Sequence, residues 1–288
     1  VAETLRFENK VFENEFTAKA IRNAITSKDG KTLIFNAAGY LYRKNLPDGI
    51  PEKIAGDENM LAGEPAFSSD GKTLVYTTWN DEKRGAIQLL GASKSPATKS
   101  LGNHIFRTPS FSPDGKQIVF RIQDGDDEMG PAMTDKPGIY IADATGTDVP
   151  RFVSDNGENP KFSADGKRIF VQTGGALFGG LDKSLKSYDL NGKDEKVHVK
   201  SKYAHSFTVS PDGKWLAFIE LHKTYICAFP QIGKTLDLSA DTKAVPATVV
   251  SRDAGYNLHW SGDSQKLHYT LGEEYFTIDL KERFAYLP

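Results

Sequence analysis

The sequence predicts an all-β fold, a six-bladed β-propeller that occupies residues 1–288 as a single domain. A motif in which an apolar stretch ends in serine and a tight Asp-Gly-type turn occurs six times, with turn aspartates at Asp29, Asp70, Asp114, Asp165, Asp212 and Asp263. Successive aspartates stand 41 to 51 residues apart, close to the roughly 40 to 50 residues of propeller repeats. Each turn leads into an apolar run that is too short for a typical helix.

Each repeat is expected to begin with an inner strand, near residues 22, 63, 107, 158, 205 and 256. A second strand follows the turn and carries the triplets Leu33-Ile34-Phe35, Leu74-Val75-Tyr76, Ile118-Val119-Phe120, Ile169-Phe170-Val171, Leu216-Ala217-Phe218 and Leu267-His268-Tyr269. Short apolar runs bounded by turn residues are typical of strands covered on both faces. A blade that lies between two other blades requires such covering.

A third strand is expected in most repeats, at residues 87–90, 139–143, 185–190, 224–229 and 274–280. A weaker, more polar fourth strand would lie at the rim, which gives four-stranded blades around an axis. A solenoid would need capping ends, and the sequence offers none.

The last repeat lacks a fourth strand, because only eight residues follow its third strand at Leu280. The stretch from Glu3 to Phe12 alternates like a strand, so we predict that it completes the last blade and closes the ring. Closure would also hide the edges of the sheets. Because the chain begins at Val1 rather than Met, we expect a piece of a longer polypeptide.

Composition excludes several classes of partner and site. The 36 basic and 38 acidic residues nearly balance, and no basic stripe suits nucleic acid. No apolar run reaches the roughly 18 residues of a membrane span. Cys227 is the only cysteine, which excludes an internal disulfide, and we expect it to be buried. We expect a monomer.

The sequence contains no catalytic signature. It has neither a Gly-x-Ser-x-Gly elbow nor a His-Glu-x-x-His pair. The acidic run 124–128 lacks the alternating spacing of a calcium loop, so a solvated loop is the better interpretation. The six turn aspartates are interpreted as backbone chemistry of Asx turns, and we assign no catalytic residue.

Polar residues recur four positions before each repeat serine, namely Asn23, Glu64, Thr108, Asn159, Ser206 and Asn257. They are expected to ring one mouth of the central channel, opposite the Asp-Gly turns. Around them we expect a ligand- or partner-binding face that adds Arg22, Arg107, His205, Trp79, Asp81, Arg84 and His222. One interpretation is that strand starts at a water-filled channel are simply polar. The other is that oxygens converge there on calcium, with Asn23, Glu64, Asn159 and Asn257 as ligands; no cofactor is otherwise expected.

The repeat FSPDGKxIxF resembles the TolB-like (PD40, WD40-like) β-propeller family. Residues 22–49, 63–81, 156–170 and 256–284 resemble, more narrowly, the propeller part of secreted bacterial proteins in which such repeats precede an amidohydrolase domain. The chain lacks the His-x-His metal pair of amidohydrolases, so the resemblance brings no active-site residue.

The resemblance implies a periplasmic or secreted, non-catalytic module of an exported hydrolase that binds or gates a substrate or a partner domain. The partner would be a downstream hydrolase domain or a cell-envelope protein. Two alternatives stay open at this point. One is a channel-centred, calcium-dependent enzyme similar to lactonases, and the other is a free-standing TolB-like protein-binding propeller.

Overall fold

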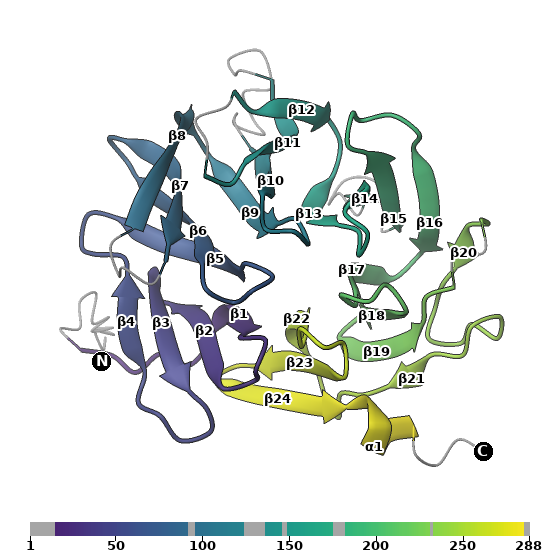
Figure 1. The fold of residues 1–288 in the computed structure, drawn as a ribbon. Helices are drawn as coiled ribbons and strands as arrows, with labels where there is room; N and C mark the ends of the chain where they lie inside the picture. Colours follow the sequence, from purple (N-terminus) through teal and green to yellow (C-terminus); the bar gives the residue numbers. More distant parts are fainter. Residues whose placement is uncertain are drawn as a thin grey trace, which may run out of the picture.

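The computed structural model describes residues 15–91, 96–123, 136–145, 149–174, 182–230 and 233–284. Six sheets stand around a common axis, and each sheet is one blade (Figure 1). Their strand pairs are antiparallel except for one parallel pair in blade 4. One short helix, α1 (Leu280–Phe284), follows the last strand. The prediction of an all-β, six-bladed propeller is therefore confirmed.

The strands of each blade follow one another from the axis outward. Blade 1 contains β1 (Arg22–Thr26), β2 (Thr32–Ala37), β3 (Tyr40–Asn45) and β4 (Glu52–Ala55). Blade 2 contains β5 (Leu61–Phe67), β6 (Leu74–Asn80), β7 (Arg84–Leu90) and β8 (Pro96–His104). Blade 3 contains β9 (Phe106–Phe111), β10 (Gln117–Ile122), β11 (Gly138–Asp143) and β12 (Arg151–Ser154).

The second half of the ring is less regular. Blade 4 contains β13 (Glu158–Phe162), β14 (Arg168–Gly174), β15 (Lys183–Asp189), β16 (Lys196–Ser201) and β20 (Leu236–Asp237). Blade 5 contains β17 (Ala204–Val209), β18 (Trp215–Glu220), β19 (Lys223–Ala228) and β21 (Thr248–Val249). Blade 6 contains β22 (Tyr256–Trp260), β23 (Lys266–Leu271) and β24 (Glu274–Asp279).

The prediction of four strands in every blade is wrong for blade 4, which has five. The chain leaves blade 5 after β19, and β20 then pairs in parallel with the outer strand β16, with Val199 opposite Leu236. The excursion is anchored by Leu236 and Leu238, which are both buried. The physical reason is that these apolar residues are buried in one cluster with Leu185 and Val199 of blade 4, and β20 covers the edge strand β16.

Blade 6 has three strands among the described residues, as expected for the part of this blade that the C-terminal repeat supplies. The strand expected to reach Leu280 ends at Asp279, because Leu280 begins α1. The Asp279 carboxylate accepts a hydrogen bond from the Lys281 backbone N–H at 2.9 Å, as the cap of a helix start does. Residues 3–12 lie outside the described residues, so the ring-closing strand stays a prediction.

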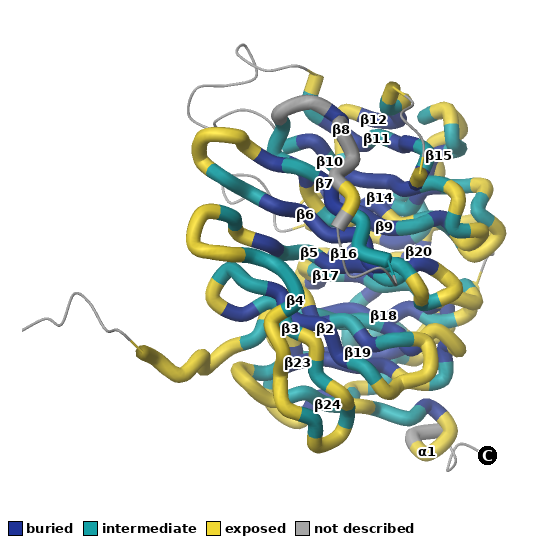
Figure 2. The backbone as a smooth tube through the Cα atoms, turned by 60° about the vertical axis from the view of Figure 1, so that its left-hand side comes forward, coloured by how far each residue is buried: buried dark blue, intermediate teal, exposed yellow. Residues whose placement is uncertain are grey.

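The apolar core lies between neighbouring blades. Ile118 and Phe120 of β10 are fully buried and belong to one cluster with Val75 and Ile87 of blade 2. Figure 2 shows that buried residues lie in the strands and that most exposed residues lie in the loops. Each such side chain contributes about 1.5 to 3 kcal/mol on burial. Cys227 is buried as expected, and burial raises the pKa of its thiol to about 12.

The Asp-Gly turns satisfy their own polar groups. In the first turn the Ser27 hydroxyl donates to Asp29 Oδ1 at 2.6 Å, and the same oxygen accepts the Lys31 N–H at 3.1 Å. Ser27 Oγ also accepts the Thr32 N–H at 2.9 Å. These three hydrogen bonds recur in all six blades, with the turn serines at Ser27, Ser68, Ser112, Ser163, Ser210 and Ser261.

Candidate binding site at the channel mouth

The polar residues four positions before the repeat serines share an unusual backbone conformation. Five of them have positive φ angles between 44° and 52°, namely Asn23, Glu64, Thr108, Asn159 and Asn257. Pairing between the inner and second strands is irregular at this point in every blade, as at a β-bulge. Asparagine tolerates this conformation, whereas other side chains lose about 1 to 2 kcal/mol. Backbone geometry thus gives a reason for three asparagines here without a ligand.

Glu64 links blade 2 to blade 3 at the mouth. Its Oε1 accepts from Arg107 Nη1 at 2.9 Å, and its Oε2 accepts from the Thr108 backbone N–H at 2.5 Å. Arg107 also donates through Nε to Gln123 Oε1 at 3.0 Å. The Glu64 side chain is only 16% exposed. Both carboxylate oxygens are therefore occupied by the neighbouring blade.

Asn257 makes the corresponding link between blade 6 and blade 1. Its Oδ1 accepts from the Asn23 backbone N–H at 3.1 Å. Its amide nitrogen donates to the Ile21 carbonyl at 3.2 Å and to the Thr270 hydroxyl at 2.5 Å. The structure brings these asparagines together as a structural pair. Within the described residues, no group of three His, Cys, Asp or Glu side chains is placed to hold a metal ion.

The contacts from blade to blade continue around the mouth. Glu158 of blade 4 pairs with Arg121 of blade 3 at 3.5 Å and with Lys183 at 3.6 Å. Lys183 also donates to the His205 carbonyl of blade 5 at 3.1 Å. The His205 ring nitrogen Nε2 lies 3.0 Å from the Leu221 carbonyl. Lys183 has no place in the repeat pattern, so only the pairing of β15 with its neighbours identifies it.

Lys161 is a second residue that the sequence pattern did not single out. It stands two positions before its repeat serine, where the other blades carry Ile25, Ala66, Ser110, Thr208 and His259. Lys161 is the one charged residue of this set, since burial lowers the pKa of His259 to about 4 and keeps its ring neutral near pH 7. An alignment of the six repeats at this position would have revealed it.

Trp79, Asp81 and Arg84 lie together in the hairpin between β6 and β7. The Trp79 indole N–H donates to Asp81 Oδ1 at 2.8 Å, and Arg84 has a positive φ of 62°. No hydrogen bond or ion pair between described residues joins this hairpin to Glu64 or Arg107. These three residues therefore form a separate group on blade 2, in which Asp81 and Arg84 are exposed and Trp79 is half-buried.

The remaining predicted site residues, Arg22 and His222, are exposed. Arg22 begins β1, the inner strand of blade 1. The His222 carbonyl accepts the Gly255 N–H at 3.2 Å, which ties blade 5 to the segment before β22. No described residue lies within hydrogen-bonding or ion-pair distance of either side chain.

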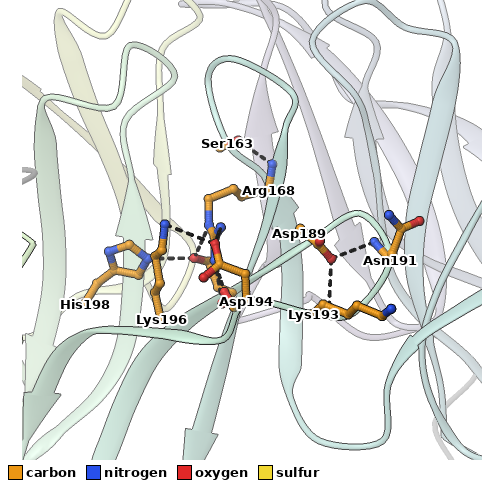
Figure 3. A network of polar contacts seen from close by, with 9 residues as sticks. Ser163, Arg168, Asp189, Asn191, Lys193, Asp194, Lys196 and His198 are labelled. Atoms are coloured by element: carbon orange, nitrogen blue, oxygen red, sulfur yellow. Dashed lines mark hydrogen bonds and ion pairs between the residues drawn. The ribbon is translucent and has the colours of Figure 1, made fainter.

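A polar network occupies the Asp-Gly end of blade 4 (Figure 3). Arg168 donates to Ser187 Oγ at 2.8 Å and pairs with Asp194 at 2.7 Å, and Lys196 lies 3.1 Å from the same carboxylate. His198 Nε2 lies 2.7 Å from Ser187 Oγ. Desolvation, and then the charges of Arg168 and Lys196, lower the pKa of His198 to about 4. A neutral histidine held in this way is a structural group.

A cavity of about 630 Å³ lies between blades 1 and 2, on the face that carries the Asp-Gly turns. Its walls include the apolar side chains Ile34, Phe67 and Leu74, and its lining also includes Lys28 and Lys72. Sequence reasoning directed attention to the opposite face and did not find this cavity. Its two walls come from different repeats, so no single motif marks it.

In the part of the chain that the structure describes, no helix has the length and apolar character that crossing a bilayer takes. No family model matches the chain. An uncharacterised protein of Agrobacterium fabrum is 30% identical over 155 residues, which cover 51% of this chain and 48% of that protein. The Tol-Pal system protein TolB of Francisella tularensis is 32% identical over 77 residues, which cover 27% of this chain and 16% of TolB. The matches thus span half or less of these relatives.

Solved structures share the architecture at low sequence identity. A protein of Agrobacterium tumefaciens, solved as a TolB, superposes with a TM-score of 0.64 at 19% identity, covering 88% of this chain and 91% of that one. TolB of Acinetobacter baumannii superposes with a TM-score of 0.60 at 19% identity, covering 82% of this chain and 55% of that TolB. A gluconolactonase of Xanthomonas campestris superposes with a TM-score of 0.63 at 14% identity, covering 91% of this chain and 86% of the gluconolactonase. The chain therefore has a TolB-like six-bladed β-propeller fold, a fold that is also found in enzymes.

Proposed function

We propose that the chain is a non-catalytic, TolB-like propeller module of an exported, amidohydrolase-type hydrolase. Its channel mouth binds or gates a substrate or a partner domain. The observation that carries this proposal is the rim itself, in which Glu64, Arg107 and Asn257 are fixed by contacts between blades. A rigid polar rim presents its exposed neighbours, such as Arg22 and His222, in constant positions. Such a surface suits recognition.

The relatives support the cellular setting of this proposal. The Francisella relative is by name a component of the Tol-Pal system, and the resemblance of the repeats to secreted bacterial proteins points the same way. We infer a periplasmic or secreted location and a partner that is either a downstream hydrolase domain or a cell-envelope protein. The exposed residues beside this rim, such as Arg22 and His222, supply the means of binding.

The test begins with the gene. The gene should encode a hydrolase domain after Pro288. A reading frame that ends near Pro288 would contradict the proposal that the chain is a module of a hydrolase. The downstream domain, produced separately, should bind the 288-residue chain in isothermal titration calorimetry. Arg22→Glu at the mouth should weaken that binding at least tenfold. The matched control Lys72→Glu, on the Asp-Gly face, should change it less than twofold.

The competing function is a metal-dependent enzyme similar to the gluconolactonase in fold. Two of its four candidate calcium ligands, Glu64 and Asn257, already use their oxygens to accept N–H groups of neighbouring blades. We therefore expect calcium and its removal by a chelator to leave the midpoint of thermal unfolding unchanged. A calcium-dependent rise that Asn257→Ala abolishes, together with lactone hydrolysis, would favour the enzyme.

A further inference from the structure

We infer that the central channel holds a carboxylate-binding site in which Lys161 supplies the cation. The ligand is a carboxylate of the partner that docks at the mouth, either an acidic side chain or a chain terminus. This inference rests on the proposed function for the identity of its ligand. The site itself rests on the position, accessibility and charge of Lys161.

The position of Lys161 places it in the channel wall. It lies on β13, the innermost strand of blade 4, between the buried Pro160 and the half-buried Phe162. In a propeller the innermost strands surround the central channel, as their arrangement in Figure 1 shows. Lys161 is nevertheless exposed to solvent. Water that reaches a side chain on this strand reaches it through the channel.

The surroundings of Lys161 agree with a confined, water-filled space. Desolvation by the protein around the channel lowers the pKa of the Lys161 amine, and the charge of Glu64 opposes this shift. Glu64 belongs to blade 2, which is two blades away. The charges of Lys161 and Glu64 therefore act on each other across the space that the inner strands surround.

The positive charge of Lys161 has no partner of its own. No described acceptor lies within hydrogen-bonding or ion-pair distance of its ammonium group, and both oxygens of Glu64 are taken by Arg107 and Thr108. A cation in a confined space is costly unless an anion accompanies it. At the corresponding position the other five blades carry uncharged groups, so blade 4 alone has a cation there.

The charge of the mouth favours entry of an anion. The described contacts of blades 2 to 4 place Arg107, Arg121 and Lys183 at the mouth against two carboxylates, Glu64 and Glu158. With Lys161 included, the balance is positive, and a positive opening attracts an anion toward the cation inside. One unpaired ammonium matches one monovalent anion. This match favours a carboxylate over a doubly charged phosphate.

The direct test uses the 288-residue chain with isotope-labelled lysines and side-chain NMR. The signal of Lys161 is identified by its loss in Lys161→Met. The chain is titrated at pH 7 and constant ionic strength with acetate, with its neutral isostere acetamide, and with inorganic phosphate. Acetate should shift the Lys161 signal saturably, at least five times as far as that of Lys28 on the Asp-Gly face. Acetamide should not shift it.

A Lys161 shift that only follows that of Lys28 would overturn the inference, and so would saturation by phosphate at a lower concentration than by acetate. Lys161→Met should unfold at the same temperature as the parent chain or higher, since it removes an unpaired charge. If this variant does not fold, Lys161→Gln replaces it, because glutamine keeps hydrogen-bonding capacity and loses only the charge.

A second measurement separates the carboxylate site from the proposed function. Lys161→Met should weaken binding of the downstream domain at least tenfold. If that domain binds the variant within twofold of the parent chain, the carboxylate inference fails and the proposed function stands. If acetate binds at Lys161 but the downstream domain does not bind the chain, the site stands and the proposed function fails.

Discussion

The two faces of the propeller satisfy their polar groups in different ways. At the Asp-Gly turns, every hydrogen bond of the repeated set joins residues no more than five apart, and all six blades make the same set. At the channel mouth, Glu64 reaches Thr108, 44 residues away, and Asn257 reaches Asn23, 234 residues away. The turns are thus a property of each repeat. The mouth is a property of how neighbouring blades meet, and it can differ from blade to blade.

The largest expected effect comes from breaking one link of the mouth. Glu64→Ala leaves Arg107 and the Thr108 N–H without their acceptor and should lower the free energy of unfolding by about 3 kcal/mol. Asp70→Ala, in the turn of the same blade, should lower the free energy of unfolding by much less, because this exposed carboxylate lies where water can replace it as an acceptor. Urea denaturation measures both values. Equal losses would remove the distinction between the two faces.

Acid should lower the stability of the fold through buried histidine and through the turn aspartates, at different pH values. His268 is 4% exposed, and desolvation, then the nearby His259, lower its pKa to about 3. Because the unfolded chain takes up a proton near pH 6.5, the contribution of this neutral ring is complete above that pH. It declines as the pH falls, by about 2 kcal/mol at pH 5.

The turn aspartates act at lower pH. Their hydrogen bonds lower the pKa of carboxylates such as Asp29, chiefly through Ser27, so their contribution persists above the unfolded value near 4 and is lost as the pH falls below it. Stability measured between pH 7 and 3 should therefore decline in two stages. In His268→Phe the first stage should be smaller. An unchanged dependence of stability on pH in this variant would contradict the assignment of the first stage to His268.

The next expected effect concerns the turn backbone. Gly71 has a φ of 72°, and a Cβ there would meet nothing within 4 Å. Gly71→Ala should therefore cost about 1 kcal/mol from the left-handed conformation alone. Gly71→Asn should cost less than half of this, because asparagine tolerates the conformation. Thermal unfolding measures the difference, and equal losses would point to a steric cause instead.

The smallest expected effect is a gain at the mouth. Thr108 has a φ of 44°, and its buried hydroxyl has no hydrogen-bond partner among the described residues. Thr108→Gly should stabilise the chain by about 0.5 kcal/mol, since it relieves the backbone and removes the unpaired group. Asn159→Gly should change stability less. A loss of stability in Thr108→Gly would show that this hydroxyl has a role of its own.

The sequence predicted the repeated part of the fold because its determinants are local. Ser27, Asp29 and Gly30 form a turn from residues that are already adjacent, and the apolar triplets mark the covered strands. The count of strands was wrong where a distant segment decided it, as where Leu236 joins β16. The positive φ shared by Asn23 and Glu64 also follows from irregular pairing between strands. The repeat pattern located these positions but did not predict their backbone conformation.

By itself, the sequence determined the six blades, the positions of the turns and the ring of polar residues four positions before each serine. A spacing and a local hydrogen-bonding pattern are enough for these features. Only the tertiary structure decided that Glu64 is engaged by Arg107, while no described residue pairs with the exposed Lys161 on the innermost strand of blade 4. Those outcomes depend on which residues of different blades meet around the axis. The arrangement of the blades sets these distances, and the order of residues along the chain does not.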